Sequence, residues 1–467
     1  RGGVRLLCWY DGACTRMVAA SWFGVALSTA EGAEAYVAQV YNWQCAVPFQ
    51  CYLSREMVKD IYYKFIQFSL GIYDGREFVD GSALIGFDWE RFFGFARKQT
   101  LVGIIMEGIS KLPKSVAPTQ KLLMNWFMAS QGIRRQNWML NEATVDIYNK
   151  VRAAGYDCCI LKGQANAAMY PNPAARTPGD VDMWVKASRE EIRALAHSLA
   201  KENGRVDEES FSHIAITLNG VCVELHYTPG FMANFVYSRR LQRWFADSIE
   251  GQCRNMIALP DGAGEVASPT PAFNAVYQLY HLYHHYFYEG VGLRQVVDYY
   301  YVISNFELGV WNCRLCDEEL KNCELEFQNS KLNNSKSAKP IIQSSKLKIQ
   351  NSLKRLGLWN FAGAMMYVLH EVMGLSEELM IAPIDKTRGR MLLDDILHGG
   401  NFGHHDKRHA WGHEAYKDNG FKHGALGHNL LRLYRDARLL RYYPAEALSE
   451  PLFRIWHLFW RMRNKKC

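Results

Sequence analysis

The chain has 467 residues, of which 49% are hydrophobic and 13% aromatic, and its formal net charge at pH 7 is +7. This length and composition supply enough apolar side chains for two or three packed domains, which excludes a largely disordered protein. No uninterrupted apolar run reaches the roughly 18–20 residues of a membrane-spanning helix. Two of the twelve cysteines, Cys158 and Cys159, lie in a predicted buried strand. This placement favours reduced thiols, and therefore a cytoplasmic protein.

The chain is predicted to have a small α/β region between two helical regions. Residues 1–56 lack clear periodicity and form a non-core segment that need not belong to the domain. The remaining predicted parts are an N-terminal helical region 57–152, an α/β core 153–265, the first part of a second helical region 266–312, an insertion 313–352, and the second part of that helical region 353–467. The insertion is rich in Gln, Asn, Ser and Lys, so we expect a flexible surface segment that cannot build a core.

Within the α/β core, the predicted elements follow one another closely. In chain order they are a strand 157–161, a helix 164–170, a strand 180–185, a helix 188–203 and a hairpin 213–227. Lys162 and Gly163 form the turn between the first strand and the first helix. A lysine beside a strand end can extend its stem over apolar neighbours. We favour a second role, in which Lys162 and the helix N-terminus near Gln164 bind an anion.

Two carboxylates lie two residues apart on the next predicted strand. Asp180 and Asp182 therefore leave the same face, with Cα atoms roughly 6–7 Å apart, while Val181 and Met183 occupy the other face. An isolated Asp-x-Asp pair is most often a solvated strand face. Together with Lys162 and a third carboxylate, however, this pair favours a metal site.

The third carboxylate, Glu224, is placed by the hairpin. Asn219-Gly220 predicts a two-residue turn that pairs Leu218 with Val221, and so Ala215 with Glu224. One face of the hairpin is then aliphatic. The other carries Glu224, with His213 opposite His226 one pair along. A register slip would bury the Glu and His side chains, so the register is well specified.

The motifs Leu161-Lys162-Gly163, Arg176-x-x-Gly179-Asp180-x-Asp182 and Glu224-Leu225-His226 resemble the uncharacterised nucleotidyltransferase family of the DNA polymerase β superfamily. The resemblance extends over roughly residues 85–440, including Gly399-Gly400-Asn401-Phe402-Gly403. It implies an α+β fold with a small mixed sheet of the polymerase β type, flanked by helical regions. In the wider superfamily the residue after the glycine is usually Ser and helps to bind phosphate, whereas here it is Gln164.

This resemblance implies a transferase that moves a nucleoside monophosphate from an NTP, ATP by preference, to a hydroxyl acceptor. Asp180, Asp182 and Glu224 would be catalytic and would hold two Mg²⁺ ions, with Mn²⁺ as an alternative, and Glu224 would also be a candidate base. The nucleotide would be bound by Lys162, Gly163, Gln164 and Arg176, although Arg176 could equally pair with a neighbouring carboxylate. We expect His213 and His226 to orient the metal ligands.

A second set of residues is predicted on the acceptor side. His281 and His285 are one helical turn apart, a spacing that more often reflects packed or hydrogen-bonded histidines than metal ligands. Arg294 and Asp298 are spaced for a pair within one helix, and the resemblance alone implies that they face the acceptor.

Several alternatives remain open from the sequence. The chain could nucleotidylate a partner protein, as an antitoxin-like regulator would, or it could be a catalytically silent scaffold that binds nucleotide or a partner. The basic segment 452–466 alternates Arg with apolar residues. We favour a docked terminal helix there over contact with nucleic acid or an acidic membrane.

Overall fold

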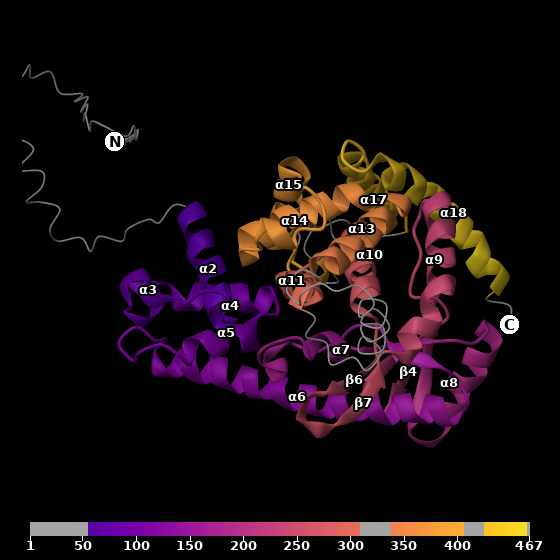
Figure 1. Ribbon diagram of the computed structural model, residues 1–467, viewed down its shortest axis with the longest axis horizontal. Coiled ribbons are helices and arrows are strands. Elements are labelled where there is room, and N and C mark those ends of the chain that lie inside the picture. Colours follow the sequence, from indigo (N-terminus) through magenta and orange to yellow (C-terminus); the bar gives the residue numbers. More distant parts are fainter. Residues whose placement is uncertain (1–54, 309–337, 406–424, 465–467) are drawn as a thin grey trace, which may run out of the picture. The chain divides into compact units, whose positions relative to one another are not determined.

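The computed structural model describes residues 55–308, 338–405 and 425–464 (Figure 1). Of the predicted N-terminal segment, residues 1–54 lie outside this part, and so do residues 313–337 of the insertion. From Arg55 onward the described chain belongs to one compact unit.

A five-stranded mixed sheet forms the centre of the α/β core, with strand order β1-β2-β5-β4-β3. Its strands are β1 (Cys158–Ile160), β2 (Val181–Val185), β3 (Gly204–Glu209), β4 (His213–Leu218) and β5 (Val221–His226). β2 and β5 run parallel, whereas every other neighbouring pair is antiparallel. The predicted α+β class with a small mixed sheet is therefore confirmed.

The hairpin β4–β5 has the predicted register. Leu218 pairs with Val221, Ala215 with Glu224, and His213 with His226. Asn219 and Gly220 both have positive φ, 48° and 82°, as a two-residue turn requires at both central positions. The turn thus determines which strand face Glu224 occupies.

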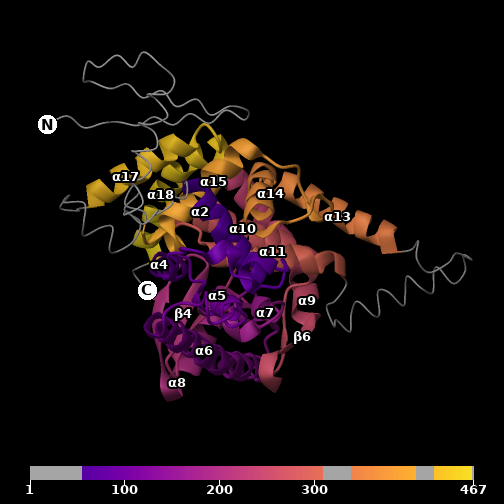
Figure 2. The same cartoon turned by 90° about the vertical axis from the view of Figure 1, so that its left-hand side faces the viewer.

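Two helical regions accompany this sheet, and the second of them, orange to yellow, lies above the α/β core in Figure 2. The N-terminal region contains α2 (Arg55–Ser69), α3 (Arg76–Val79), α4 (Trp89–Lys98), α5 (Val102–Ile109) and α6 (Gln120–Ala153). The core adds α7 (Gln164–Ala167), α8 (Arg189–Asn203) and α9 (Phe235–Arg254). The second region contains α10 (Pro271–Tyr288), α11 (Leu293–Leu308), α13 (Ala338–Arg355), α14 (Trp359–Met373), α15 (Lys386–Gly399), α17 (Ala425–Leu439) and α18 (Pro444–Asn464).

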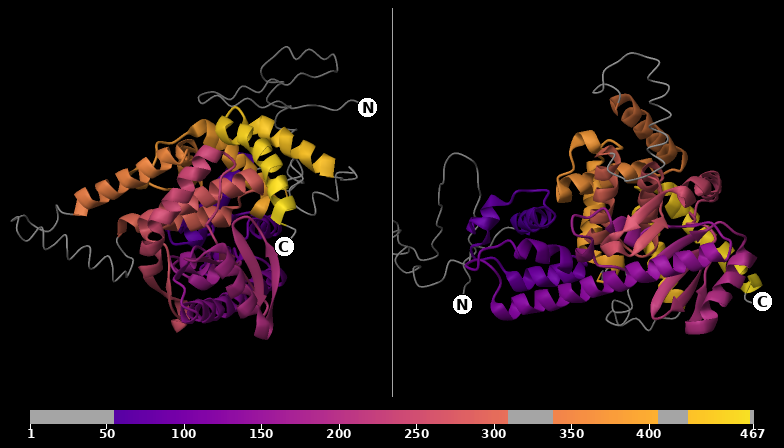
Figure 3. Two further views of the ribbon diagram at one scale, coloured as in Figure 1. Left: turned by 90° about the vertical axis from the view of Figure 1, so that its right-hand side faces the viewer. Right: turned by 60° about the horizontal axis from the view of Figure 1, so that its bottom comes forward.

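The long helix α6 joins the first helical region to the sheet. It has 34 residues and contacts α4 and α5 as well as β1 and β2, and it runs along the lower edge of the right-hand view in Figure 3. α10 and α9 cover the face of β2 that carries Asp182. Trp184, which lies on that face, has its ring 6.0 Å from Phe273 and 5.7 Å from Phe245.

Three short strands were not expected from the sequence. β3 (GRVDEE) is polar and lies at one edge of the sheet, so it lacks the apolar alternation that marks a half-buried strand. β6 (Met256–Leu259) and β7 (Gly264–Ala267) form a separate antiparallel pair of four residues each. Strands this short carry too few residues for a period to be read.

The prediction for the insertion is wrong at its C-terminal end. Residues from Ala338 onward form α13, and within the part assigned to the insertion Ile349 is only 2% exposed. α13 contacts α10 and α14, so this end of the segment packs in the second helical region. The Lys- and Ser-rich composition indicated a flexible segment, although its few apolar residues form one buried stripe along a helix.

The terminal helix α18 packs on one side only. Phe453 is buried, with its ring stacked 5.0 Å from that of Phe231. Leu452, Ile455 and Phe459 are each more than half exposed. Among the described helices, none is both long and apolar enough to span a membrane.

The sequence predicts buried thiols at Cys158 and Cys159 and also at Cys222 in the hairpin, and the structure agrees only in part. Cys158 and Cys159 are buried free thiols, whereas Cys222 is exposed on the same strand face as Glu224.

Candidate active site

A cavity of about 300 Å³ lies where the sheet meets α10 and α11. Its lining combines residues from the N-terminal helical region, the α/β core and the second helical region: Thr100, Lys162, Gly163, Arg176, Thr177, Pro178, Gly179, Asp180, Asp182, Gln278, His281, Leu282, Arg294, Gln295, Asp298, Asn401 and Phe402. Most of these side chains are polar or charged. A cavity with convergent polar groups of this kind is the expected form of a small-molecule site.

Three carboxylates meet at the edge of this cavity. Asp182 and Glu224 are directly opposite each other in the parallel pair β2–β5, and Asp180 precedes β2. One oxygen from each of Asp180, Asp182 and Glu224 lies within 4.8 Å of the others. Carboxylate oxygens are the ligands that Mg²⁺ prefers in proteins, so the donor set fits the cation that the family resemblance implies.

Lys162 and Gly163 lie beside the carboxylates. Lys162 Nζ is 3.2 Å from Asp182 Oδ2. Burial lowers the pKa of Lys162, but the nearby carboxylates, Asp182 first, raise it more, so it stays charged. Gly163 has φ of 65°, and a Cβ there would be 3.2 Å from the Asp180 carbonyl oxygen. A residue with a side chain would therefore be strained at this turn.

His226 bridges two of the carboxylates. Its Nε2 is 3.1 Å from Asp182 Oδ1 and 3.3 Å from Glu224 Oε2. Burial lowers the pKa of His226, whereas hydrogen bonds to Asp182 and Glu224 raise it more, to about 9. At neutral pH, the charges of His226 and Lys162 therefore offset two of the three negative charges, and the group keeps a net charge of −1.

His213 lies on the outer side of the same cluster. Its Nδ1 is 3.4 Å from Glu224 Oε2, and burial followed by the charge of His226 lowers its pKa. His213, Glu224 and His226 also bring one ligand atom each within 4.8 Å. Since Glu224 belongs to both groups, we interpret the two histidines as groups that orient the carboxylates.

A chain of hydrogen bonds leads from Lys162 to α10. Lys162 Nζ donates to His281 Nε2 over 3.0 Å, and His285 Nε2 lies 3.1 Å from the same nitrogen. On its other side, His285 Nδ1 donates to Glu289 Oε2 over 2.8 Å. Burial raises the pKa of Glu289, but the hydrogen bond to His285 lowers it more, to about 2.

The predicted pair Arg294–Asp298 is part of a larger buried group. Arg176 binds Asp298 with two hydrogen bonds, Nε to Oδ1 at 2.7 Å and Nη2 to Oδ2 at 2.9 Å. Tyr170 donates to Asp298 Oδ1 over 2.6 Å, and Arg294 Nη1 lies 3.4 Å from Oδ2. Of the two roles left open for Arg176, the structure thus shows the carboxylate pair.

Gln164 is placed away from the cavity. Its side chain is 2% exposed and its Nε2 donates to the Oδ1 atoms of Asn141 and Asn137 on α6. It is not among the residues that line the cavity. Where the wider superfamily usually has a serine, this chain therefore uses the side chain to join α7 to α6.

Sequence patterns did not predict which residues form the far wall of the cavity. Asn401 and Phe402 reach it because backbone segments pack closely there: a Cβ on Gly290 would be 2.6 Å from Gly403 N, and one on Gly292 would be 2.8 Å from Asn401 Cα. Gln278 was also missed. A usable signal was present in α10, where Asn274, Gln278, His281 and His285 form a polar stripe at helical spacing.

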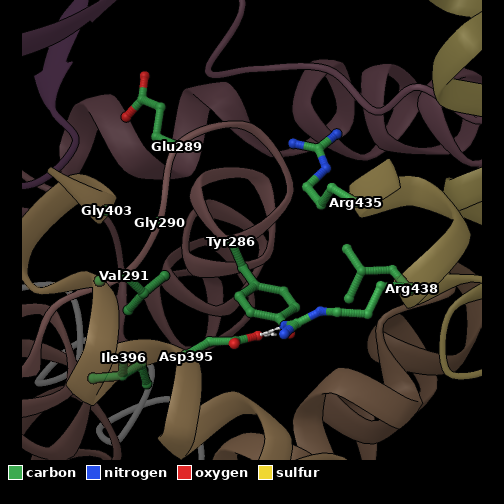
Figure 4. Close-up of a pocket in the computed structure, with 11 residues that line it drawn as sticks. Tyr286, Glu289, Gly290, Val291, Asp395, Ile396, Gly403, Arg435 and Arg438 are labelled. Carbon is green, nitrogen blue, oxygen red and sulfur yellow. Dashed lines mark hydrogen bonds and ion pairs between the residues drawn. The ribbon is translucent and has the colours of Figure 1, made fainter. Parts of the chain in front are cut away.

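A second hollow, of about 30 Å³, lies between α10, α15 and α17 (Figure 4). Tyr286 donates to Asp395 Oδ2 over 2.9 Å, and Arg438 forms an ion pair with the same oxygen. This volume is about a tenth of that of the cavity beside the carboxylates. The hollow therefore cannot hold a nucleotide.

A family of known proteins matches this chain in sequence. The family model described as "Uncharacterised nucleotidyltransferase" matches residues 86–329, which include every predicted metal ligand. No curated protein matches. A crystal structure of an antigenic nucleotidyltransferase-like protein from Paracoccidioides brasiliensis is similar at 17% identity over 47% of this chain and 92% of that chain, with a TM-score of 0.27.

The family model covers more than half of the 467 residues, and the three carboxylates that carried the resemblance converge in the structure. The chain belongs to the uncharacterised nucleotidyltransferase family.

Proposed function

We propose that the protein is a Mg²⁺-dependent nucleotidyltransferase that transfers a nucleoside monophosphate from an NTP, ATP by preference, to a hydroxyl acceptor. The observation that carries this proposal is the convergence of Asp180, Asp182 and Glu224 beside Lys162 at the edge of one cavity. In the reaction the acceptor oxygen bonds to the α-phosphorus, the bond to the β-phosphate oxygen breaks, and pyrophosphate leaves.

The three carboxylates would hold the metal. Mg²⁺ bound there would neutralise phosphate charge and lower the pKa of the acceptor hydroxyl. Burial raises the pKa of Glu224, but the hydrogen bond and charge of His226 lower it more, to about 2. A carboxylate that stays ionised at neutral pH is suited to bind a cation, and it is a weak general base. We therefore favour Glu224 as a metal ligand over the base role considered from the sequence.

Lys162 would act on the nucleotide side of the cavity, and His281, which the sequence placed on the acceptor side, would contact it there. The Lys162 ammonium can bind phosphate oxygens as a point charge, while His281 orients it by accepting a hydrogen bond from it. Burial and the charge of Lys162 lower the pKa of His281 well below its ordinary value. His281 is therefore neutral and able to accept that hydrogen bond.

The test uses ATP labelled at either the α- or the γ-phosphate. The full chain, incubated with Mg²⁺ and a metabolite and protein extract, should pass label to an acceptor from α-labelled ATP and not from γ-labelled ATP. The variant Asp180→Asn should lose this transfer. Asp247→Asn, which changes an exposed carboxylate on α9, should retain it.

The same experiment separates the alternatives. Label on a protein band identifies protein nucleotidylation, and label on a small molecule identifies a metabolite acceptor. A scaffold would bind ATP without transferring label to either. Transfer by Asp180→Asn at the parent rate would contradict the proposed mechanism.

A further inference from the structure

We propose that the cavity contains a subsite for an oxyanion, a phosphate or carboxylate group of a substrate, at Arg294. This inference rests on the proposed function, because it specifies the chemistry of a substrate for that site. It adds an anion position on α11 that is separate from Lys162.

The first argument is the charge of the buried group. Arg176 and Arg294 bring two guanidinium groups to one carboxylate, Asp298. Arg176 takes both oxygens of Asp298, and Tyr170 donates to one of them as well. Arg294 is left with a single contact of 3.4 Å. The group therefore keeps one positive charge, which Arg294 carries.

The second argument is that the surroundings of Arg294 disfavour this charge. Its side chain is 11% exposed, and it is the second residue of α11, where the positive end of the helix dipole opposes a cation. Burial, and next the charge of Arg176, lower the pKa of Arg294. A buried charge without a full partner is costly, and an anion in the cavity would supply that partner.

The third argument is that Arg294 faces the cavity together with an unpaired acceptor. Arg294 and Asn401 both line the space of about 300 Å³. Asn401 Oδ1 is buried and has no hydrogen-bond partner among the described residues. The planar fork of an arginine matches the geometry of phosphate and carboxylate. A substrate group that brings an oxyanion to Arg294 and a hydroxyl to Asn401 would satisfy both side chains.

The test measures the binding of inorganic phosphate to the full chain by isothermal titration calorimetry, without metal or nucleotide. Arg294→Gln should weaken binding at least about 10-fold, since a hydrogen bond to a charged group is worth about 1.5–3 kcal/mol and 1.4 kcal/mol is tenfold. The variant should fold, because Asp298 keeps Arg176 and Tyr170. Arg390→Gln, an exposed arginine on α15, is the matched control and should bind phosphate like the parent.

Arg294→Lys provides a second comparison. It keeps the charge and removes the fork, so its phosphate affinity should fall between those of the parent and Arg294→Gln. Equal affinity in the parent and Arg294→Gln, or the absence of phosphate binding to the parent, would overturn the proposal. A loss of the same size in Arg390→Gln would also overturn it, because general electrostatics would then explain the binding.

A second titration, with saturating ATP and Mg²⁺, identifies the source of the anion. If phosphate still binds and Arg294→Gln still weakens its binding, the subsite serves the acceptor. If ATP displaces phosphate and Arg294→Gln also weakens ATP, it serves the nucleotide. Neither titration requires group transfer. Arg294-dependent binding without transfer would therefore refute only the proposed function, and transfer with unchanged binding in Arg294→Gln would refute only the subsite.

Discussion

Asp182→Asn is expected to destabilise the metal-free protein, although it removes one of three clustered negative charges. The asparagine keeps the shape of the side chain and a hydrogen-bonding oxygen, so the change is mainly one of charge. Two opposing effects follow. The repulsion from Asp180 and Glu224 is relieved, while the attraction to Lys162 and His226 is lost.

The distances decide which effect is larger. At an effective dielectric constant of 20, an attraction at 3.1–3.2 Å is worth about 5 kcal/mol, and a repulsion at the 4.8 Å upper limit costs about 3.5 kcal/mol. With two attractions and two repulsions, attraction exceeds repulsion by up to roughly 3 kcal/mol, at the lower end of the about 3–5 kcal/mol found when a buried pair loses one partner.

The assay has two stages. Urea denaturation in the presence of a chelator should show an unfolding free energy lower by about 3 kcal/mol in Asp182→Asn than in the parent. Titration with Mg²⁺ and ATP should then raise the melting temperature of the parent and leave that of the variant unchanged. Asp247→Asn should behave like the parent in both stages.

Two results would refute this reasoning. If metal-free Asp182→Asn is as stable as the parent or more stable, Lys162 and His226 do not compensate the carboxylates as their distances indicate. If Mg²⁺ stabilises variant and parent equally, Asp182 is not a metal ligand.

Three further predictions concern Lys162, His226 and α13. Lys162→Ala should weaken ATP binding by about 1.5–3 kcal/mol, less at high salt, and leave adenosine binding unchanged. Because its pKa is raised, protonated His226 stabilises the metal-free protein below pH 6.5 by an amount on the order of 3 kcal/mol. This stabilisation should disappear as the pH rises through about 9. His226→Gln should therefore flatten the curve of unfolding free energy against pH. Deleting 317–337 should barely change the melting temperature, whereas Ile349→Asp should lower it, because Ile349 is buried.

Each of these outcomes can be contradicted directly. Equal losses of adenosine and ATP affinity in Lys162→Ala would mean that Lys162 supports the shape of the pocket. If the curve of unfolding free energy against pH is the same in His226→Gln as in the parent, the titration of His226 does not contribute to stability. A stable Ile349→Asp would show that α13 does not pack as described.

The hairpin and its carboxylate were predictable because short-range rules determine them. The Asn219-Gly220 turn defines the pairing, and the alternation of side chains then assigns Glu224 to its face. Asp180 and Asp182 follow from strand period alone. These inferences need only neighbours in sequence or across one turn.

The rest of the site depends on contacts that sequence spacing does not encode. Arg176 and Asp298 are 122 residues apart and meet only because α11 packs beside the turn before β2. Gln164 follows the motif glycine as a phosphate-binding residue would, yet α6 supplies Asn137 and Asn141 as nearer partners. Ile349 is buried because it lies on the apolar stripe of α13, although the segment around it is mostly polar. In each case the sequence was equally compatible with two interpretations, and tertiary packing determined which of them the structure adopts.

Gly290 and Gly292 lie in close contact with the backbone of residues 401–403. This contact limits which fragments of the protein can form the complete cavity. The family match ends at residue 329, but Asn401 and Phe402, which line the cavity, come more than seventy residues later. A fragment cut to the family boundaries would carry every predicted metal ligand and still have one side of its substrate chamber open to solvent. The smallest portion of the chain able to enclose a substrate therefore extends at least through Gly403.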